Sequence, residues 1–470
     1  MVRSAELSSV SVARQHLLDY FADLTQTTIV IKHLPASMSA SWNKKVINLP
    51  PLPNETWLQI LEWATFVPGI LDPDIHNPFD YPLPAPFRPP LDTAEEQREI
   101  RMSLVTKRYL VRVCKRWHAL AMPLLYESVY IGRVRSLLSL RDNLVASQRQ
   151  ETEGGIACAL GLWVRRLDVA VRDFHGQPND SWPLPDIMNC LPKLRILIMV
   201  TKRPSLFPPT LLAIGKTCGS SLQKLMCNTY TSTLCQGETG FRDLRNLRTL
   251  ITGPVFDQNW AAVCPFAMTL SPSCDFVTLP NIRARPHVHE GLDDGYTSFP
   301  FFRQARICLS VSEAHLSPCV LEMLAVRGSK LTTAYLDLTS KNSVKSVTGA
   351  LKKHCPRLAH IIIVVDSWYT FLHESSVDPQ FPPITHLGLS CRENQTRHST
   401  YNSIFRYLVD FAPRTLEVVR FLNPRGVADL RDHHSEALVV GASQLRKLGI
   451  RVEDHEGNDL TRGGFAGVSS

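Results

Sequence analysis

The sequence lacks the long apolar run that a membrane-spanning helix needs. Its uninterrupted apolar stretches, such as residues 361–365, have the length of a β-strand and fall far short of the roughly 18 residues that cross a bilayer. Residues 1–10 also lack the basic start and apolar core of a secretory signal. We therefore expect a chain without membrane association, located in the cytoplasm, the nucleus or both.

Signatures of catalysis and of metal binding are missing as well. There is no glycine-rich phosphate-binding loop, no Gly-x-Ser-x-Gly elbow and no metalloprotease helix. The histidine pairs at 287/289 and 433/434 lack companion ligands, and there is no Cys-x-x-Cys pair. We expect a protein that is not an enzyme and holds no cofactor. The alternative is an enzyme whose active site is assembled from residues that are distant in the sequence.

The 12 cysteines are scattered, which favours reduced thiols over a disulfide framework. Cys190, Cys218 and Cys355 each precede a strand-starting leucine by three or four residues. A thiol at a repeated structural position usually behaves as a small buried hydrophobe. We expect these three to be structural.

A length of 470 residues, 44% of them hydrophobic and 20% charged, suits two or three folded domains or a small module followed by an extended array. One internal segment departs from this composition. Residues 68–100 carry eight prolines within their first 23 positions, a density that excludes a regular helix or a central strand. We expect this segment to loop out as extended chain of low order.

Two amphipathic helices flank this proline-rich insertion. In the first, Asn54 is placed as the N-cap, and Trp57, Ile60, Leu61 and Ala64 form one apolar stripe that ends before Pro68. The second is expected to begin after Ser103 and to stop near Pro123, with an apolar face of Leu110, Val113, Cys114, Trp117, Leu120 and Ala121. These faces are large for such short helices, which favours a docking module. A small helical core that binds nothing is the alternative.

The ordered apolar positions of this region resemble the F-box, and fungal F-boxes often carry a long insertion between their first two helices. The likeness covers residues 47–131, under a fifth of the chain. It implies docking on a Skp-type adaptor, which bridges to a cullin–RING ubiquitin ligase. Carried over by position, the adaptor contacts would be Leu52, Pro53, Trp57, Ile60, Leu61, Val113, Cys114, Trp117 and Leu124.

Positive charge is concentrated in the same region. Residues 101–149 contain ten Arg or Lys and two acids, a local net of +8 that equals the net charge of the whole chain. Such a surface attracts an acidic partner or a polyanion, and the Skp-type adaptors of the resemblance are acidic. A solvated helix face is the alternative. Nucleic acid is disfavoured because no aromatic-interleaved basic motif or zinc finger accompanies the charge.

Beyond residue 155 a short phrase, apolar-x-x-apolar-x-apolar, recurs ten times. Its first members are separated by 25 to 32 residues, except for one interval of 55 that predicts a degenerate unit near residues 276–279. Such a period predicts a solenoid in which each unit is a strand followed by a helix or loop. Helices are expected at 209–216, 318–326, 344–354 and 404–411.

This pattern resembles divergent leucine-rich repeats, although the usual asparagine is mostly missing; a different α/β domain with evenly spaced strands is the alternative. The fold class is therefore α/β, with a small helical module followed by a curved parallel-strand solenoid. In such an array the residues between the core leucines line the concave binding face. An apolar substrate groove is expected there, lined by Ile196, Ile198, Val200, Ile362 and Val364, unless inserted loops cover these strands.

We expect four segments: an N-terminal extension at 1–46, the docking module at 47–131, the repeat array at 132–453 and a flexible tail at 454–470, with a loop interrupting the array at 281–298. The hypothesis is a substrate receptor of a Skp–cullin–F-box ubiquitin ligase, which recruits an unknown protein through the array. The alternative is an interaction scaffold that does not assemble a ligase.

Overall fold

The computed structural model describes residues 52–80, 93–152, 159–171, 182–200, 207–227, 243–252, 275–280, 303–309, 316, 318–338, 344–372, 381–392 and 397–460. The chain forms two compact units: unit 1 is Met1–Ile70 with Glu95–Val129, and unit 2 is Leu71–Ala94 with Tyr130–Ser470. The expected extension at 1–46 and the loop at 281–298 lie outside the described residues. No helix within the described ranges is long and apolar enough to cross a membrane.

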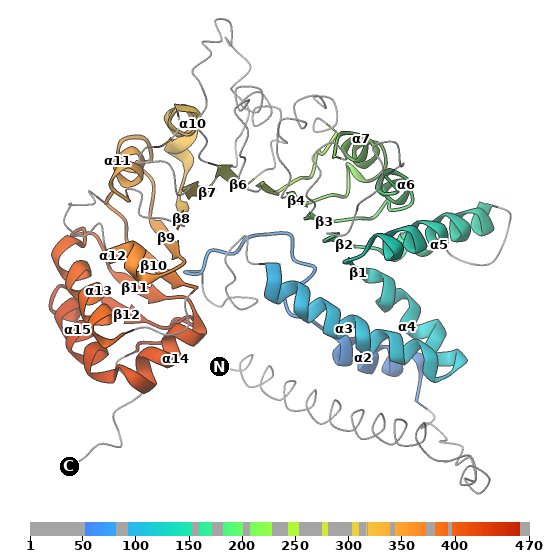
Figure 1. Cartoon of the computed structure of the whole chain (residues 1–470), viewed down its shortest axis with the longest axis horizontal. Coiled ribbons are helices and arrows are strands. Elements are labelled where there is room, and N and C mark those ends of the chain that lie inside the picture. The colour runs from blue at the N-terminus through green and yellow to red at the C-terminus, as the bar shows by residue number, and fades with distance from the viewer. Residues whose placement is uncertain are drawn as a thin grey trace, which may run out of the picture. The chain divides into compact units, whose positions relative to one another are not determined.

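Unit 1 contains three described helices, α2 (Asn54–Thr65), α3 (Thr93–Val113) and α4 (Lys115–Glu127), which Figure 1 colours blue to teal. The apolar spacing of the sequence correctly places Trp57, Leu61 and Ala64 on the buried side of α2. The rings of Trp57 and Trp117 lie 5.2 Å apart at the centre of the core. Its buried members are Trp57, Leu61, Leu110, Trp117, Ala121 and Leu124.

Three local expectations for these helices are wrong. The single second helix is two helices, because Cys114 adopts an extended backbone and its thiol accepts the Trp117 N–H, which caps α4. Asn54 is not an N-cap, since its side-chain oxygen accepts from Arg116 Nε at 2.8 Å and Pro53 holds the cap position. Pro123 lies inside α4, which continues to Glu127.

Unit 2 is built on one twelve-stranded sheet in which the strands follow their order along the chain. Pairing is parallel in every register given from β2 to β12. The strands are β1 (Ser128–Ile131), β2 (Arg166–Val169), β3 (Ile196–Met199), β4 (Lys224–Cys227), β5 (Thr249–Thr252), β6 (Phe276–Pro280), β7 (Gln304–Leu309), β8 (Thr333–Leu338), β9 (His360–Val365), β10 (His386–Cys391), β11 (Val418–Phe421) and β12 (Arg451–Glu453).

Helices connect many of the strands, as parallel neighbours require. In Figure 1, α6, α7, α10, α11, α13 and α15 lie on one face of the sheet. All four sequence-predicted helices are confirmed, as α7, α10, α11 and α13. The described helices of this unit are α5 (Val134–Thr152), α6 (Leu184–Asn189), α7 (Phe207–Cys218), α10 (Pro318–Arg327), α11 (Val344–His354), α12 (Trp368–Leu372), α13 (His398–Phe411), α14 (Pro424–His433) and α15 (Ser435–Lys447).

The register explains the repeated phrase. The second apolar residue of each phrase pairs with its counterpart on the next strand, as Leu167 does with Leu197 and Leu197 with Leu225. These side chains are fully buried. The degenerate unit expected near residues 276–279 is the strand β6, where Val277 continues the same row. The strand predicted from the last phrase, which begins at Leu445, is wrongly placed. The strand starts at Arg451, and Leu448 is 54% exposed at the end of α15.

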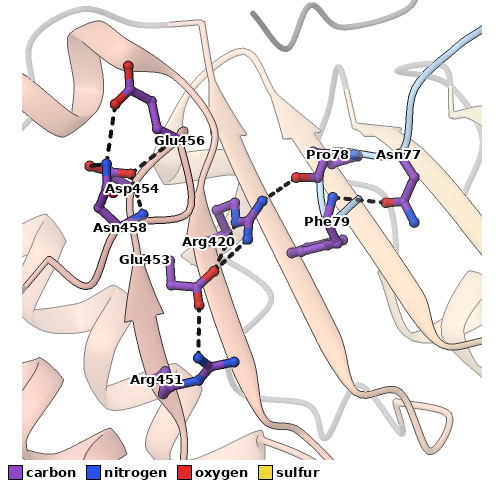
Figure 2. A network of polar contacts seen from close by, with 9 residues as sticks. All are labelled: Asn77, Pro78, Phe79, Arg420, Arg451, Glu453, Asp454, Glu456 and Asn458. Carbon is purple, nitrogen blue, oxygen red and sulfur yellow. Dashed lines mark hydrogen bonds and ion pairs between the residues drawn. The ribbon is translucent and has the colours of Figure 1, made fainter. Parts of the chain in front are cut away.

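Both boundaries of the expected array also shift. The sheet begins with β1, whose residues the sequence assigned to the docking module. At the other end, residues 454–460 are not a loose tail. Asp454 is buried and accepts the backbone N–H groups of Glu456 and Asn458 at 2.9 Å each, which holds the turn shown in Figure 2. Leu460 is buried too, so the expected tail can begin only after residue 460.

The expected structural cysteines are confirmed as buried free thiols in Cys190, Cys218 and Cys355. Burial raises the pKa of the Cys218 thiol to about 12, and it does the same for Cys355. Both thiols therefore stay protonated at neutral pH and act as packing groups.

Candidate docking face and a strap on the sheet

The expected adaptor contacts of unit 1 divide into core and surface. Trp57, Leu61, Trp117 and Leu124 are buried, with exposed fractions of 8% or less, so they form the module's own core. The resemblance implies that these four side chains contact the adaptor directly, and their burial leaves little of each one accessible to a partner. Helical spacing marks a core stripe and a docking stripe in the same way. The larger expected surface reduces to Leu52, Ile60 and Cys114, which are half-buried, and Pro53 and Val113, which are exposed.

The sequence prediction missed a second apolar row on α3. Met102, Val105, Tyr109 and Val113 follow one another at intervals of three, four and four residues, which places them on one side of a helix. All four are exposed: Met102 by 64%, Val105 by 44%, Tyr109 by 58% and Val113 by 51%. The buried side of α3 carries Ile100, Leu104 and Leu110 instead, so this helix is apolar on two sides.

The end of α2 also carries two large exposed side chains, Trp63 and Phe66. Ser103 donates to the Thr65 carbonyl at 2.6 Å, which brings the end of α2 against α3. Phe66 and Met102 are the chain neighbours of that bonded pair, and Phe66 is 54% exposed. We define the docking face of unit 1 as Trp63, Phe66, Met102, Val105, Tyr109 and Val113.

Basic side chains run beside the docking face. Arg101, Arg108 and Arg112 are exposed and recur at intervals of seven and four residues, so they form a row next to the apolar one. Lys107 is different: it is buried, and desolvation lowers the pKa of its ammonium. The basic stretch 101–149 is divided between the two units, whose boundary falls at residues 129 and 130.

In unit 2 the proline-rich insertion contributes a strap, defined as residues 72–80. The expectation that this part loops out with low order is wrong, because the strap lies along the sheet and meets successive strands. The contacts run in chain order: Asp74 pairs with Arg248 beside β5, Ile75 and His76 bond Gln304 of β7 and Tyr335 of β8, Asn77 bonds His360 of β9, and Pro78 and Phe79 meet Arg420 of β11.

Arg420 holds the end of the strap to the sheet (Figure 2). Its guanidinium donates to the Pro78 carbonyl and to Glu453 Oε2, from Nε at 3.0 Å and from Nη2 at 2.6 Å. The guanidinium carbon also lies 5.1 Å from the centre of the Phe79 ring. Arg420 and Glu453 are 7% and 6% exposed, so the pair is buried. A buried guanidinium with bonds in several directions fixes the chain that it touches.

The strap closes the groove that the sequence predicted. Ile196, Ile198, Ile362 and Val364 are at most 2% exposed, and Val200 is partly buried. They do share one face of the sheet, as expected, with Met226, Phe276 and Tyr335. Ile75 and Phe79 of the strap pack against this cluster. The expected exposed apolar groove is therefore wrong, and the alternative that inserted chain covers these strands accounts for it.

Histidines beneath the strap are held neutral. Burial, helped by the neighbouring His386, lowers the pKa of His360 to about 4. A neutral His360 leaves Nδ1 free to accept from the Asn77 amide at 2.8 Å. On the strap itself His76 behaves oppositely, because its hydrogen bond to Asp72 raises the pKa of its ring. The His360 ring that accepts from Asn77 is therefore uncharged at neutral pH.

Comparison of the chain with protein-family models and with curated proteins found no match in either set.

Proposed function

We propose that this protein is the substrate-recognition subunit of a Skp–cullin–F-box ubiquitin ligase. Unit 1 would be the F-box and bind the Skp-type adaptor, and the leucine-rich-repeat-like unit 2 would hold the protein to be modified. Catalysis would then reside in partner subunits. The chain itself would act by raising the effective concentration of substrate lysines near the loaded ubiquitin enzyme.

The observation that carries this proposal is the docking face of unit 1. A surface helix normally buries one apolar side and presents polar residues on the other. Here α3 presents Met102, Val105, Tyr109 and Val113 on the side that its own core does not use. Contiguous exposed apolar side chains of this size mark interaction sites.

The chemistry of the face suits the proposed adaptor. The basic row of Arg101, Arg108 and Arg112 would attract an acidic protein and orient it over the apolar row. Apolar anchors would then supply most of the affinity, and the charges would mainly set the rate and specificity of association.

The regular order of the sheet supports the receptor half of the proposal. The twelve strands follow one another in chain order, and buried apolar side chains lie in register on neighbouring strands. Stacked repeats would produce this arrangement. Proteins built this way offer extended binding surfaces.

The test is capture of a recombinant Skp-type adaptor by the purified full chain. Because Trp117 is core, substituting it could unfold unit 1, so the variant should change the surface: Val105→Asp with Tyr109→Asp. The matched control is Val440→Asp with Tyr369→Asp. These residues are exposed to similar extents, Val440 by 50% against 44% for Val105 and Tyr369 by 59% against 58% for Tyr109.

We expect the wild type and the control to bind the adaptor, and the docking-face variant to lose at least about a hundredfold in affinity, since two central interface anchors contribute roughly 2 kcal/mol or more each. Equal binding by all three folded proteins, or binding by none, would reject the assignment of unit 1. The second outcome would leave the scaffold alternative.

A further inference from the structure

The backbone of the strap makes part of its contacts with the sheet. Three side chains of the sheet donate to strap carbonyls: Gln304 Nε2 to Ile75 at 3.1 Å, Tyr335 OH to His76 at 3.3 Å, and the Arg420 guanidinium to Pro78. Every residue of any peptide carries a carbonyl. These three donors would therefore hold an extended chain whatever its side chains.

Besides Asn77, which donates to His360 Nδ1 at 2.8 Å, two strap side chains have specific partners on the sheet. Asp74 forms an ion pair with Arg248 at 3.0 Å. Five residues later the Phe79 ring lies 4.9 Å from the His386 ring and 5.1 Å from the Arg420 guanidinium carbon, which rests over its face. The face of the sheet thus distinguishes an acidic residue at one point and an aromatic residue at another.

Space beneath the aromatic position is provided by a missing side chain. A Cβ on Gly388 of β10 would lie 2.8 Å from Leu422 and 3.2 Å from Ile362, and 3.4 Å from the Phe79 ring. Glycine at this position lets the ring and the apolar cluster meet. The aromatic site is therefore shaped by the sheet, independently of the strap.

The first contact of the strap is weakly held. Arg248 is 51% exposed and Asp74 is 42% exposed, and exposed ion pairs contribute little to stability. Buried attachment is concentrated at Asn77 and Pro78, with half-buried Phe79 beside them. A segment that is anchored over so few residues can be exchanged for another chain that makes the same contacts.

We infer that the strap is an internal competitor for a peptide-binding site on this face of unit 2. The ligand would be an extended peptide with an acidic residue and, five positions later, an aromatic residue. Bound peptide would take the three carbonyl donors, the Arg248 contact and the site over Gly388, and the strap would leave. The inference rests on the proposed assignment of unit 2 as the substrate-binding part, and it names the class of substrate.

The test measures peptide binding to the full chain without any adaptor, so it can fail separately from the docking proposal. The probe is a fluorescein-labelled peptide with the sequence of residues 71–81. The control peptide has alanine in place of the residues that correspond to Asp74 and Phe79. Binding is measured by fluorescence anisotropy with the wild type and with a strap-released variant, Asp74→Ala/Asn77→Ala/Phe79→Ala, whose fold is checked by circular dichroism.

We expect the strap-released variant to bind the probe at least tenfold more tightly than the wild type, because a tethered segment competes at an effective concentration on the order of millimolar. We also expect the control peptide to bind it at least tenfold more weakly than the probe. Equal affinity of the wild type and the released variant, equal affinity of the two peptides, or no binding at all would overturn the inference. Should the triple variant fail to fold, the single variant Phe79→Ala carries the same comparison, since it removes only a half-buried ring.

Discussion

The ion pair between Arg420 and Glu453 allows the attachment of the strap to be tested by thermodynamics. Arg420→Met removes a guanidinium from a site where both side chains are 7% exposed or less. Breaking a buried pair by removing one partner destabilises a protein by about 3–5 kcal/mol, because the remaining charge has lost its counter-charge. Glu453 keeps one partner, Arg451, at 3.6 Å, but Arg451 is 63% exposed and screened by solvent. We therefore expect the lower end of that range.

The double variant Arg420→Met/Glu453→Met should recover most of this loss, since no unpaired charge remains. It still lacks the donor to the Pro78 carbonyl, and an unsatisfied buried carbonyl costs about 1–3 kcal/mol. The coupling energy between the two substitutions should be at least about 2 kcal/mol.

Amide hydrogen exchange is the suitable assay, because melting of the whole chain would combine the opening of two units. Exchange of the β11 and β12 amides gives the free energy of opening for each variant. The strap supplies a second readout: Phe79 N–H, which donates to Asn77 Oδ1 at 3.2 Å, should exchange faster in Arg420→Met. Additive effects of the two substitutions, or unchanged exchange in the strap, would refute the reasoning.

Two further predictions concern unit 2. Gly441→Ala should destabilise it by about 1–3 kcal/mol through overpacking, because a Cβ there would lie 2.1 Å from Phe405 Cγ. Gly349→Ala, where a Cβ would meet no atom within 4 Å, should stabilise it by about 0.5–1 kcal/mol. Opening free energies from amide exchange of unit 2 that move in the same direction for both variants would contradict this packing of α13 on α15. Stability should fall between pH 7 and pH 5, because His360 has a folded pKa of about 4 and an unfolded pKa of about 6.5, so that acid protonates the unfolded state first. His360→Gln should lose less stability over that interval, and an equal loss would show that His360 does not contribute.

The repeat of unit 2 could be predicted from the sequence because its cause is local. Each unit buries one short strand, so an apolar phrase must recur at a nearly constant interval. The same regularity located β6, where only Phe276 to Leu279 remained of the phrase. The last strand was missed because apolar residues of α15 imitate the phrase: Leu445 is buried as a helix residue, ahead of Arg451.

The strap could not be predicted in the same way. Proline density correctly excludes a helix at residues 72–80, but it contains no information about where an extended segment binds. The contacts that hold this segment are long-range, and the bond from Arg420 to Pro78 joins residues 342 positions apart. From the sequence alone Ile196 and Ile362 are therefore expected to be exposed, although the chain itself covers them.

The docking residues illustrate a different limit. Periodicity shows that an apolar stripe exists, but it does not say whether the stripe faces the protein or a partner. The resemblance places Trp57 and Trp117 among the adaptor contacts, whereas the structure buries both in the core of unit 1. A usable signal was present on α3, where the row that contains Met102 and Tyr109 is separate from the row that contains Leu104 and Leu110.

The most direct test of the docking proposal is hydroxyl-radical footprinting of the full chain with and without a saturating Skp-type adaptor. Met102 and Tyr109 on the docking face are 64% and 58% exposed, and Tyr369 of unit 2 is 59% exposed and serves as the internal control. We predict that adaptor binding lowers the labelling rates of Met102 and Tyr109 several-fold and leaves that of Tyr369 unchanged. Unaltered labelling of Met102 and Tyr109 at saturating adaptor would contradict the proposal that α3 is the docking surface.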